Sequence, residues 1–386
     1  MYSKKKLIRN LILVIGILII LVILLVSLGD IKSIWNTITQ EAKPLWLLAT
    51  LGILLLYCFF NQASIVLLTK NKYKDISYLD LFCIAGSEYF FNGITPFSSG
   101  GQPFQAYALK QKNVKFSDST SILLLNFLAY QIVMNVISLF SVIFFYSDLA
   151  KDVPNLSWLI FIGFSINLVV MVVLILLGTT KFMGKGIIKL FDLISKIKFL
   201  KKFLVPKRDG LVNYVSDMQK AFIEISKSKL AWTKAVITKI FSLLIYYSIP
   251  FFSFLSIGIN LGWENFIYVS AVTSFALTLA VWVPTPGSSG GAELAFTTLF
   301  VSLTALKSGI KNPTEDPEVA KNLALSGMLI WRMFTYYLLM LIGFIFYLIF
   351  DKRNRKSEKK QELGNNQVEA NTDINAVNKI VDKDFE

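Results

Sequence analysis

The stretch that decides the fold occurs twice, as TPFSSGGQP at positions 95–103 and as TPGSSGGAE at positions 285–293. Both copies read T-P-x-S-S-G-G and begin 190 residues apart, at positions 95 and 285. Each lies inside a hydrophobic region, about 79–109 for the first motif and about 264–306 for the second. A pattern of this length in two apolar segments indicates an internal repeat.

The residues of the motif break a helix inside an apolar segment. Proline removes a backbone donor, the glycine pair permits close approach of the backbone, and the serines add hydroxyl donors. Broken backbone in hydrocarbon is tolerated only where protein buries it or where it lines a wet cavity. Both motifs therefore predict a cavity or a buried seam.

The rest of the chain has the composition of a polytopic membrane protein. Of its 386 residues 54% are hydrophobic and 17% charged, and the mean hydropathy of +0.59 excludes a water-soluble domain. A bilayer needs roughly 20 apolar residues per helical span. Six stretches qualify, and we interpret the first as a retained anchor: about 7–29, 44–69, 118–146, 155–178, 234–260 and 322–350.

Composition also limits the chemistry. The chain has no histidine, and its two cysteines, Cys58 and Cys83, lie in apolar runs, so we expect no metal site, no cofactor and no catalytic residue. The formal charge of +14 comes from lysines that flank apolar segments. That placement is typical of membrane topology and of contact with anionic lipids, and it does not favour nucleic acid.

Lysine-rich segments orient the spans. By the positive-inside rule they are cytoplasmic, which predicts a protein of the cytoplasmic membrane with both termini inside. These segments are 1–9, 70–74, 110–115, 179–234 and 351–360.

The same rule predicts that the first hairpin enters the membrane from the cytoplasm and the second from outside. Repeat one, about 44–146, and repeat two, about 234–350, then share one plan with reversed polarity. We predict an all-α fold of six full spans plus two re-entrant broken-helix hairpins, eight hydrophobic segments in an inverted repeat. The membrane domain covers 1–350, and 351–386 forms a disordered cytoplasmic tail.

The linker between the repeats, about 179–233, contains an amphipathic stretch. Residues 182–204 place Lys185, Lys189, Lys196 and Lys202 among Ile, Leu and Phe. Such a helix is expected on anionic lipids of the inner leaflet. A cytoplasmic linker with a solvated charged face is the alternative.

A new half-helix should begin after each break, at about Gln102 and about Ala292. Helix N-termini attract anions through their free N–H groups and partial positive charge. Two such ends meeting near the midplane suit a phosphate, and tight packing corners are the alternative. The predicted substrate-binding residues of the motifs are Ser98, Ser99, Gly100, Gly101, Ser288, Ser289, Gly290 and Gly291.

Arg332 is the one arginine away from the ends of a predicted span, since Arg9 lies at the very start of the first. Because an intramembrane charge needs a partner, we expect Arg332 to pair with a lipid phosphate or with Glu293. Glu293 itself is either a helix cap, a titrating group or a partner for a cationic headgroup. Glu88 is a further candidate, the matching carboxylate of the first hairpin. Lys239 is expected to snorkel to the interface from a segment end.

The two motifs, together with WRMFTYY at positions 331–337, resemble the flippase-like membrane domain of lysylphosphatidylglycerol synthases and their stand-alone relatives. The resemblance covers about residues 5–350. It implies a lipid-translocating domain in which the four motif glycines, Glu293 and Arg332 take part. The chain departs from the bifunctional members because only about 36 residues follow its last span, too few for their soluble lysine-transferring domain.

We therefore expect an integral membrane lipid translocase that moves an anionic or modified phospholipid or a glycolipid. A relative of phosphatidylglycerol lysyltransferase, or an accessory subunit to a separate lipid-modifying synthase, is the second hypothesis. The resemblance connects that role with lysyl-phosphatidylglycerol synthesis and antimicrobial-peptide resistance. A small-solute transporter is the third hypothesis, because it would share the architecture.

Overall fold

The computed structural model describes residues 36, 39–152, 157–280, 285–288, 290–307 and 317–357. The predicted span at 7–29, the predicted tail beyond residue 357 and Ser289 lie outside the described residues; positions 351–357, which we predicted as the start of a disordered tail, are helical and continue the last span. Within the described ranges every regular element is helical.

Five helices are long and apolar enough to cross a membrane, judged by length and composition. They correspond to five of the six predicted spans. The last of them is continuous through a π-helical turn, η3 (Met333–Leu338), and extends to residue 357. The five are α3 (Pro44–Lys70), α7 (Phe116–Asp152), α8 (Ser157–Thr179), α12 (Lys229–Ser256) and the helix that begins as α15 (Pro317–Arg332).

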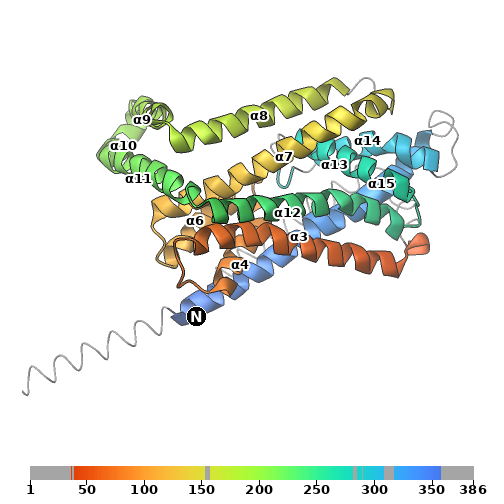
Figure 1. The fold of residues 1–386 in the computed structure, drawn as a ribbon, viewed down its shortest axis with the longest axis horizontal. Helices are drawn as coiled ribbons and strands as arrows, with labels where there is room; N and C mark the ends of the chain where they lie inside the picture. The colour runs from red at the N-terminus through yellow and green to blue at the C-terminus, as the bar shows by residue number, and fades with distance from the viewer. Residues whose placement is uncertain are drawn as a thin grey trace, which may run out of the picture.

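The two motif regions form groups of shorter helices, three in the first and two in the second. The first comprises α4 (Tyr78–Gly86), α5 (Glu88–Gly93) and α6 (Gly101–Gln111), and the second comprises α13 (Phe266–Ala280) and α14 (Gly291–Lys307). At a rise of about 1.5 Å per residue, none of these helices spans the roughly 30 Å hydrocarbon core of a bilayer. Figure 1 shows α4 and α6 toward one end of the bundle and α13 and α14 toward the other.

The core is built where α12 packs along α3 and where α13, α14 and α15 pack together. Its largest buried side chains are aromatic, and Trp331 stacks on Phe296 at a centroid distance of 4.6 Å. The outer faces of the spans carry exposed apolar side chains such as Phe144, Val169 and Leu341. An apolar surface of this extent fits contact with lipid tails.

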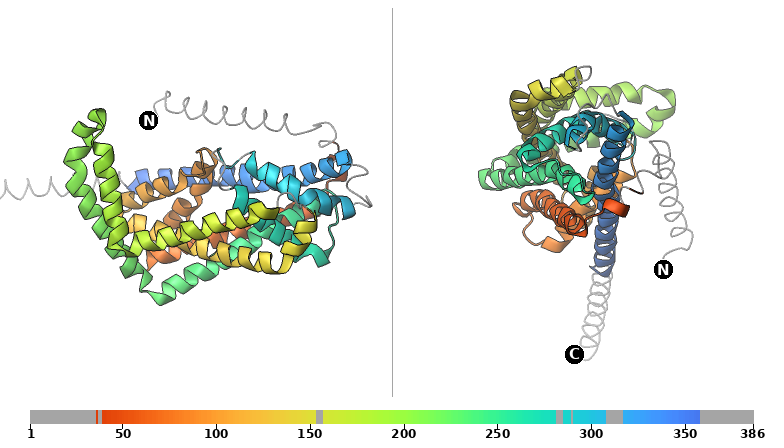
Figure 2. Two further views of the ribbon diagram at one scale, coloured as in Figure 1. Left: turned by 90° about the horizontal axis from the view of Figure 1, so that it is seen from above. Right: turned by 90° about the vertical axis from the view of Figure 1, so that its right-hand side faces the viewer.

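A group of helices crosses the bundle at one end. It consists of α9 (Lys181–Ser195), α10 (Lys198–Leu204), the short 3-10 turn η1 (Val205–Lys207) and α11 (Arg208–Ser226). Figure 2 shows these helices running across the long axis of the spans. The short η2 turn (Trp263–Asn265) lies between α12 and α13.

Candidate functional site

The two motifs meet in the folded chain. Pro96 and Pro286 form an isolated antiparallel β-bridge, so the tip of the first hairpin, 95–101, touches the tip of the second, 285–291. We call these loops the first tip and the second tip. Because the two hairpins lie toward opposite ends of the bundle, their tips meet between those ends (Figure 1).

Both tips use the same turn. The third and fourth positions of each motif have positive φ, 56° and 50° at Phe97 and Ser98, and 59° and 56° at Gly287 and Ser288. In each tip the serine amide donates to the carbonyl of the motif threonine, at 3.2 Å from Ser98 and at 3.1 Å from Ser288. The sequence repeat is therefore also a repeat of backbone conformation, up to the serine.

New helices begin directly after the breaks, at Gly101 and Gly291, one residue before the predicted positions. Their first donors already have partners in the chain. The Gly100 amide donates to Thr95 Oγ1 and the Gly101 amide to Asn92 Oδ1, both at 2.8 Å. An incoming anion must therefore displace these oxygens or bind the serine hydroxyls beside them.

Arg332 and Glu293 form a buried ion pair beneath the second tip. Arg332 Nε donates to Glu293 Oε1 at 2.7 Å, and the two side chains are only 6% and 8% exposed. Arg332 Nη2 also donates to the Gly287 carbonyl at 3.2 Å, and Glu293 Oε2 accepts from the Gly290 amide at 2.6 Å. Glu293 therefore both caps α14 and neutralises Arg332. Of the two partners that the sequence suggested for Arg332, a lipid phosphate and Glu293, the structure has Glu293.

The π-helical turn that follows Arg332 carries Tyr336 to both tips. The Tyr336 hydroxyl donates to the Gly93 carbonyl of the first hairpin at 2.9 Å. A Cβ atom at Gly287 would lie only 2.0 Å from the Tyr336 ring, so the second tip packs directly on that ring. π-helical turns often mark functional sites, and this one joins both hairpins to the last span.

Sequence reasoning assigned no role to Tyr336. The available signal was its position four residues after Arg332, which puts both side chains on one helix face. Without the tertiary contacts, nothing distinguished Tyr336 from the adjacent Tyr337.

Glu88 lies beneath the first tip but apart from Arg332. Its Oε1 accepts from Asn61 Nδ2 at 3.1 Å and its Oε2 from Gln105 Nε2 at 3.0 Å. A Cβ atom at Gly101 would lie 2.8 Å from Glu88 Cβ, so the start of α6 packs against the base of the Glu88 side chain. Each tip thus has a carboxylate close to its glycine pair.

Lys239 is the cation nearest to Glu88 in this network. Its Nζ donates to Asn61 Oδ1 at 2.6 Å and to the Asn61 carbonyl at 3.3 Å, and the residue is 2% exposed. The prediction that Lys239 snorkels to the interface is wrong. Because α12 begins at Lys229, position 239 lies about 15 Å into the helix, too deep to leave it.

The tips are open on one side. Phe97 is 57% exposed, and Pro96, Ser99 and Gly290 are also exposed. A Cβ atom at Gly290 would meet nothing within 4 Å. The place where the tips meet therefore has buried charges beneath it, Arg332 and Glu293, and an exposed apolar side chain, Phe97, at one side.

No group of three acidic or cysteine side chains among the described residues could hold a metal ion. The polar groups at the tips are hydroxyls, amides, one guanidinium and carboxylates. Such groups bind and orient a ligand through hydrogen bonds and charge.

The fold and this site define a class of protein: a multi-pass helical membrane domain with two helix-breaking loops that meet over buried charges. A family model for the transmembrane region of lysylphosphatidylglycerol synthases matches residues 11–343. The chain belongs to this family of membrane domains. No curated protein matches the chain with significant similarity.

Membership in the family confirms the resemblance drawn from the motifs and from positions 331–337. It connects the chain with lipid modification or lipid translocation.

Proposed function

We propose that this protein translocates a phospholipid or glycolipid across the cytoplasmic membrane, with the headgroup passing between the two tips. The observation that carries the proposal is the contact of the tips, Pro96 on Pro286, with the Arg332–Glu293 pair beneath it. In the proposed topology both termini are cytoplasmic, and the hairpins re-enter from opposite faces as an inverted repeat. The tips are then the barrier between the two sides.

A lipid needs a path that is polar inside and open to hydrocarbon at the side. The exposed Phe97 edge offers such an opening, because acyl chains can remain in the bilayer while the headgroup enters between the tips. The serine hydroxyls and the partly capped helix starts supply polar contacts inside. A transporter of small solutes needs an enclosed polar cavity instead.

Arg332 is positioned to receive the phosphate of a headgroup. Its guanidinium now donates to one carboxylate oxygen of Glu293 and to the Gly287 carbonyl, and a phosphate offers two oxygens that a guanidinium can bind in parallel. Exchange of Glu293 for phosphate keeps the arginine neutralised throughout, which avoids the large cost of an unpaired charge in the membrane. The released Glu293 is then available to an amine on the headgroup.

The test is lipid translocation in proteoliposomes that contain only the purified chain. Phosphatidylglycerol, its lysyl form and a glycolipid are compared through headgroup accessibility to a membrane-impermeant reagent. We expect faster translocation than in protein-free liposomes for at least one lipid, and a loss of that rate in Arg332→Ala. The matched control is Arg353→Ala, which also removes an arginine paired with a carboxylate, Asp80, but away from the tips. Wild-type protein that translocates none of these lipids contradicts the proposal.

The second candidate is a role in lipid modification, and the family description favours it because that family is named for a synthase. The chain would act as a relative of phosphatidylglycerol lysyltransferase or as an accessory subunit to a separate synthase. Incorporation of labelled lysine into phosphatidylglycerol by the purified chain, with charged tRNA supplied, would establish the enzymatic alternative. Incorporation only after a synthase is added would establish the accessory role.

A further inference from the structure

The arm formed by α9 and α10 exposes an unusual amount of apolar surface. Phe182, Leu190 and Leu193 are exposed on one face of α9, at helical spacing, and Phe199 on α10 is 91% exposed. The opposite side of α9 is packed, because Gly184 is buried against Val215 and Gln219 of α11. The arm is therefore a one-sided surface with its apolar face turned outward.

Basic side chains border this face. On the α9 helix, Lys185 and Lys189 lie on the same side as Phe182, since residues three and seven positions further on return to the same helix face. Further exposed lysines continue along the arm, at positions 181, 196, 201 and 202. An apolar strip edged by lysines matches the headgroup region of an anionic membrane, where apolar groups enter and ammonium groups meet phosphate.

The orientation of the arm is fixed by contacts with α11. Arg208 Nε and Nη2 donate to the two carboxylate oxygens of Asp192 at 2.7 and 3.0 Å, which ties the end of α9 to the start of α11. Gln219 Nε2 donates to the carbonyls of Leu177 and Thr180 at the α8–α9 corner, at 2.9 and 2.8 Å.

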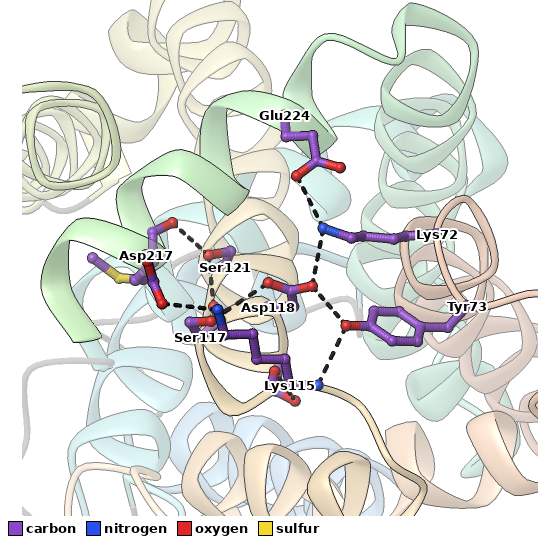
Figure 3. A network of polar contacts seen from close by, with 10 residues as sticks. Lys72, Tyr73, Lys115, Ser117, Asp118, Ser121, Asp217 and Glu224 are labelled. Carbon is purple, nitrogen blue, oxygen red and sulfur yellow. Dashed lines mark hydrogen bonds and ion pairs between the residues drawn. The ribbon is translucent and has the colours of Figure 1, made fainter. Parts of the chain in front are cut away.

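Helix α11 is in turn fastened to the bundle end. Lys72 joins Glu224 of α11 at 2.9 Å and Asp118 of α7 at 3.1 Å, and Lys115 joins Asp217 of α11 at 2.8 Å (Figure 3). Lys72 and Lys115 flank the first hairpin on its two sides in the chain. These contacts fix the position and direction of the arm relative to the spans. Through α11 the arm is connected to the segments just before and just after the first hairpin.

We propose that the α9–α10 arm is a docking site for anionic phospholipid headgroups of the cytoplasmic leaflet. Phe182 and Phe199 insert at the headgroup level, and the flanking lysines bind lipid phosphate. The inference does not depend on lipid translocation.

A lipid surface fits the arm better than a second protein chain does. The helices run across the spans, which is the direction of a membrane plane for a protein whose spans run along its normal (Figure 2). The lysines border the apolar strip along its length, whereas the cores of protein interfaces are depleted in lysine. A second copy of the chain would bring another set of the same positive charges against the first.

The experiment places an environment-sensitive dye on the full-length protein in nanodiscs. In a Cys58→Ser/Cys83→Ser background, one variant carries Phe199→Cys and the matched control carries Ser216→Cys, an exposed position on α11. Quenchers are attached to an anionic phosphatidylglycerol in one set of discs and to a neutral phosphatidylcholine in the other. The ratio of the two quenching efficiencies measures the preference for anionic lipid.

We expect a blue-shifted dye at position 199 that the lipid-borne quenchers reach, with a preference for the anionic lipid, and a water-like dye at position 216. Neutralising three arm lysines should lower this preference by about fivefold for each lysine removed, because each contributes roughly 1 kcal/mol near an anionic surface. A matched triple variant outside the arm should leave it unchanged. The arm variant is Lys185→Gln/Lys189→Gln/Lys196→Gln, and the matched variant is Lys220→Gln/Lys227→Gln/Lys229→Gln.

Three results would overturn the proposal. One is a dye at position 199 as exposed to water as the dye at position 216. Another is equal quenching by anionic and neutral lipid. The third is a blue-shifted dye at position 199 that no lipid-borne quencher reaches, which would show that a second copy of the chain covers the arm. Unchanged helical circular dichroism of the triple variants verifies that they are folded.

Discussion

The buried charge of Arg332 bears on both the stability and the proposed function of the protein. Its partner Glu293 lies at 2.7 Å, and both side chains are almost fully removed from solvent. Removing one member of such a pair leaves the other charged in a medium of low dielectric constant, which costs about 3–5 kcal/mol. Removing both members leaves neither charge behind, so stability and function can be separated by experiment.

We predict that Arg332→Met lowers the free energy of unfolding in detergent by about 3–5 kcal/mol, whereas Arg332→Met/Glu293→Gln recovers most of that loss. Thermal unfolding followed by intrinsic fluorescence measures both. The double variant should still fail to translocate lipid, because no guanidinium remains to receive phosphate. A stable double variant that translocates lipid at the wild-type rate would show that the Arg332–Glu293 pair serves only stability and that Arg332 does not receive phosphate.

Gly287 is the motif position with the least room for a side chain. Its φ is +59°, and a Cβ atom there would lie 2.0 Å from the Tyr336 ring. Gly287→Ala should therefore lower the unfolding temperature and displace Tyr336. Gly52→Ala is the matched control, because a Cβ atom at Gly52 meets nothing within 4 Å and alanine favours a helix. Equal unfolding temperatures of both variants would contradict the packing of the second tip on the Tyr336 ring.

The residues of the site differ in how far sequence could predict them. The cost of an unpaired charge in a membrane predicted that Arg332 has an anionic partner, but it left a lipid phosphate and Glu293 as equal alternatives, and the structure has Glu293. Asn61 is part of the site only because it contacts Glu88, which lies 27 positions further along the chain. Tyr336 is part of it because it contacts Gly93, 243 positions earlier. A single sequence contains no signal of such contacts.

At the scale of elements, the proline and glycine positions predicted the helix breaks and the helix starts to within one residue. The side chain that caps the start of α6 was not predictable. Asn92 Oδ1 accepts from the Gly101 amide only because the turn between them brings two residues nine positions apart together. The depth of Lys239 was misjudged for a related reason. The predicted span begins near position 234, but α12 begins five residues earlier, at Lys229, with the segment KLAWT that the prediction left outside.

The attachment of α11 should depend on pH. The hydrogen bond from Lys115 holds the pKa of the Asp217 carboxyl below its ordinary value of 3.8. A carboxyl with a lowered pKa in the folded state contributes stability above its unfolded value and loses that contribution as the pH falls through the folded value. We therefore expect α11 to loosen only below about pH 4.

Hydrogen exchange of the α11 amides, corrected for intrinsic exchange rates, measures this loosening. Wild type should lose protection below about pH 4, while Asp217→Asn should have less protection than wild type at pH 7 and a smaller change with acid. Identical pH profiles would show that the Lys115–Asp217 pair does not hold the helix.

At the scale of the whole molecule, the apolar stretches predicted the five spanning-length helices of the described residues, and the repeated motif predicted a helix break in each motif region. Entry of the two hairpins from opposite membrane faces stays a prediction. The repeated motif and positions 331–337 were also specific enough to indicate the family correctly. The inverted repeat predicted that the two breaks meet near the midplane, but the residues in contact, Pro96 and Pro286, could not be predicted, because an offset of 190 residues between two motifs does not say which residues touch. If the protein translocates lipid as proposed, the tips form a barrier and must separate when a headgroup passes.

The most direct test of this central claim is a reversible lock between the tips. Neighbouring residues across an antiparallel bridge have Cα atoms about 4.5–5.5 Å apart, which is within disulfide range. Pro96→Cys/Pro286→Cys in a Cys58→Ser/Cys83→Ser background can therefore be oxidised or reduced in the same proteoliposomes. We predict that lipid translocation stops on oxidation and returns on reduction, with each single-cysteine variant unaffected by either treatment. Translocation at an undiminished rate through the oxidised, fully cross-linked protein would contradict the account.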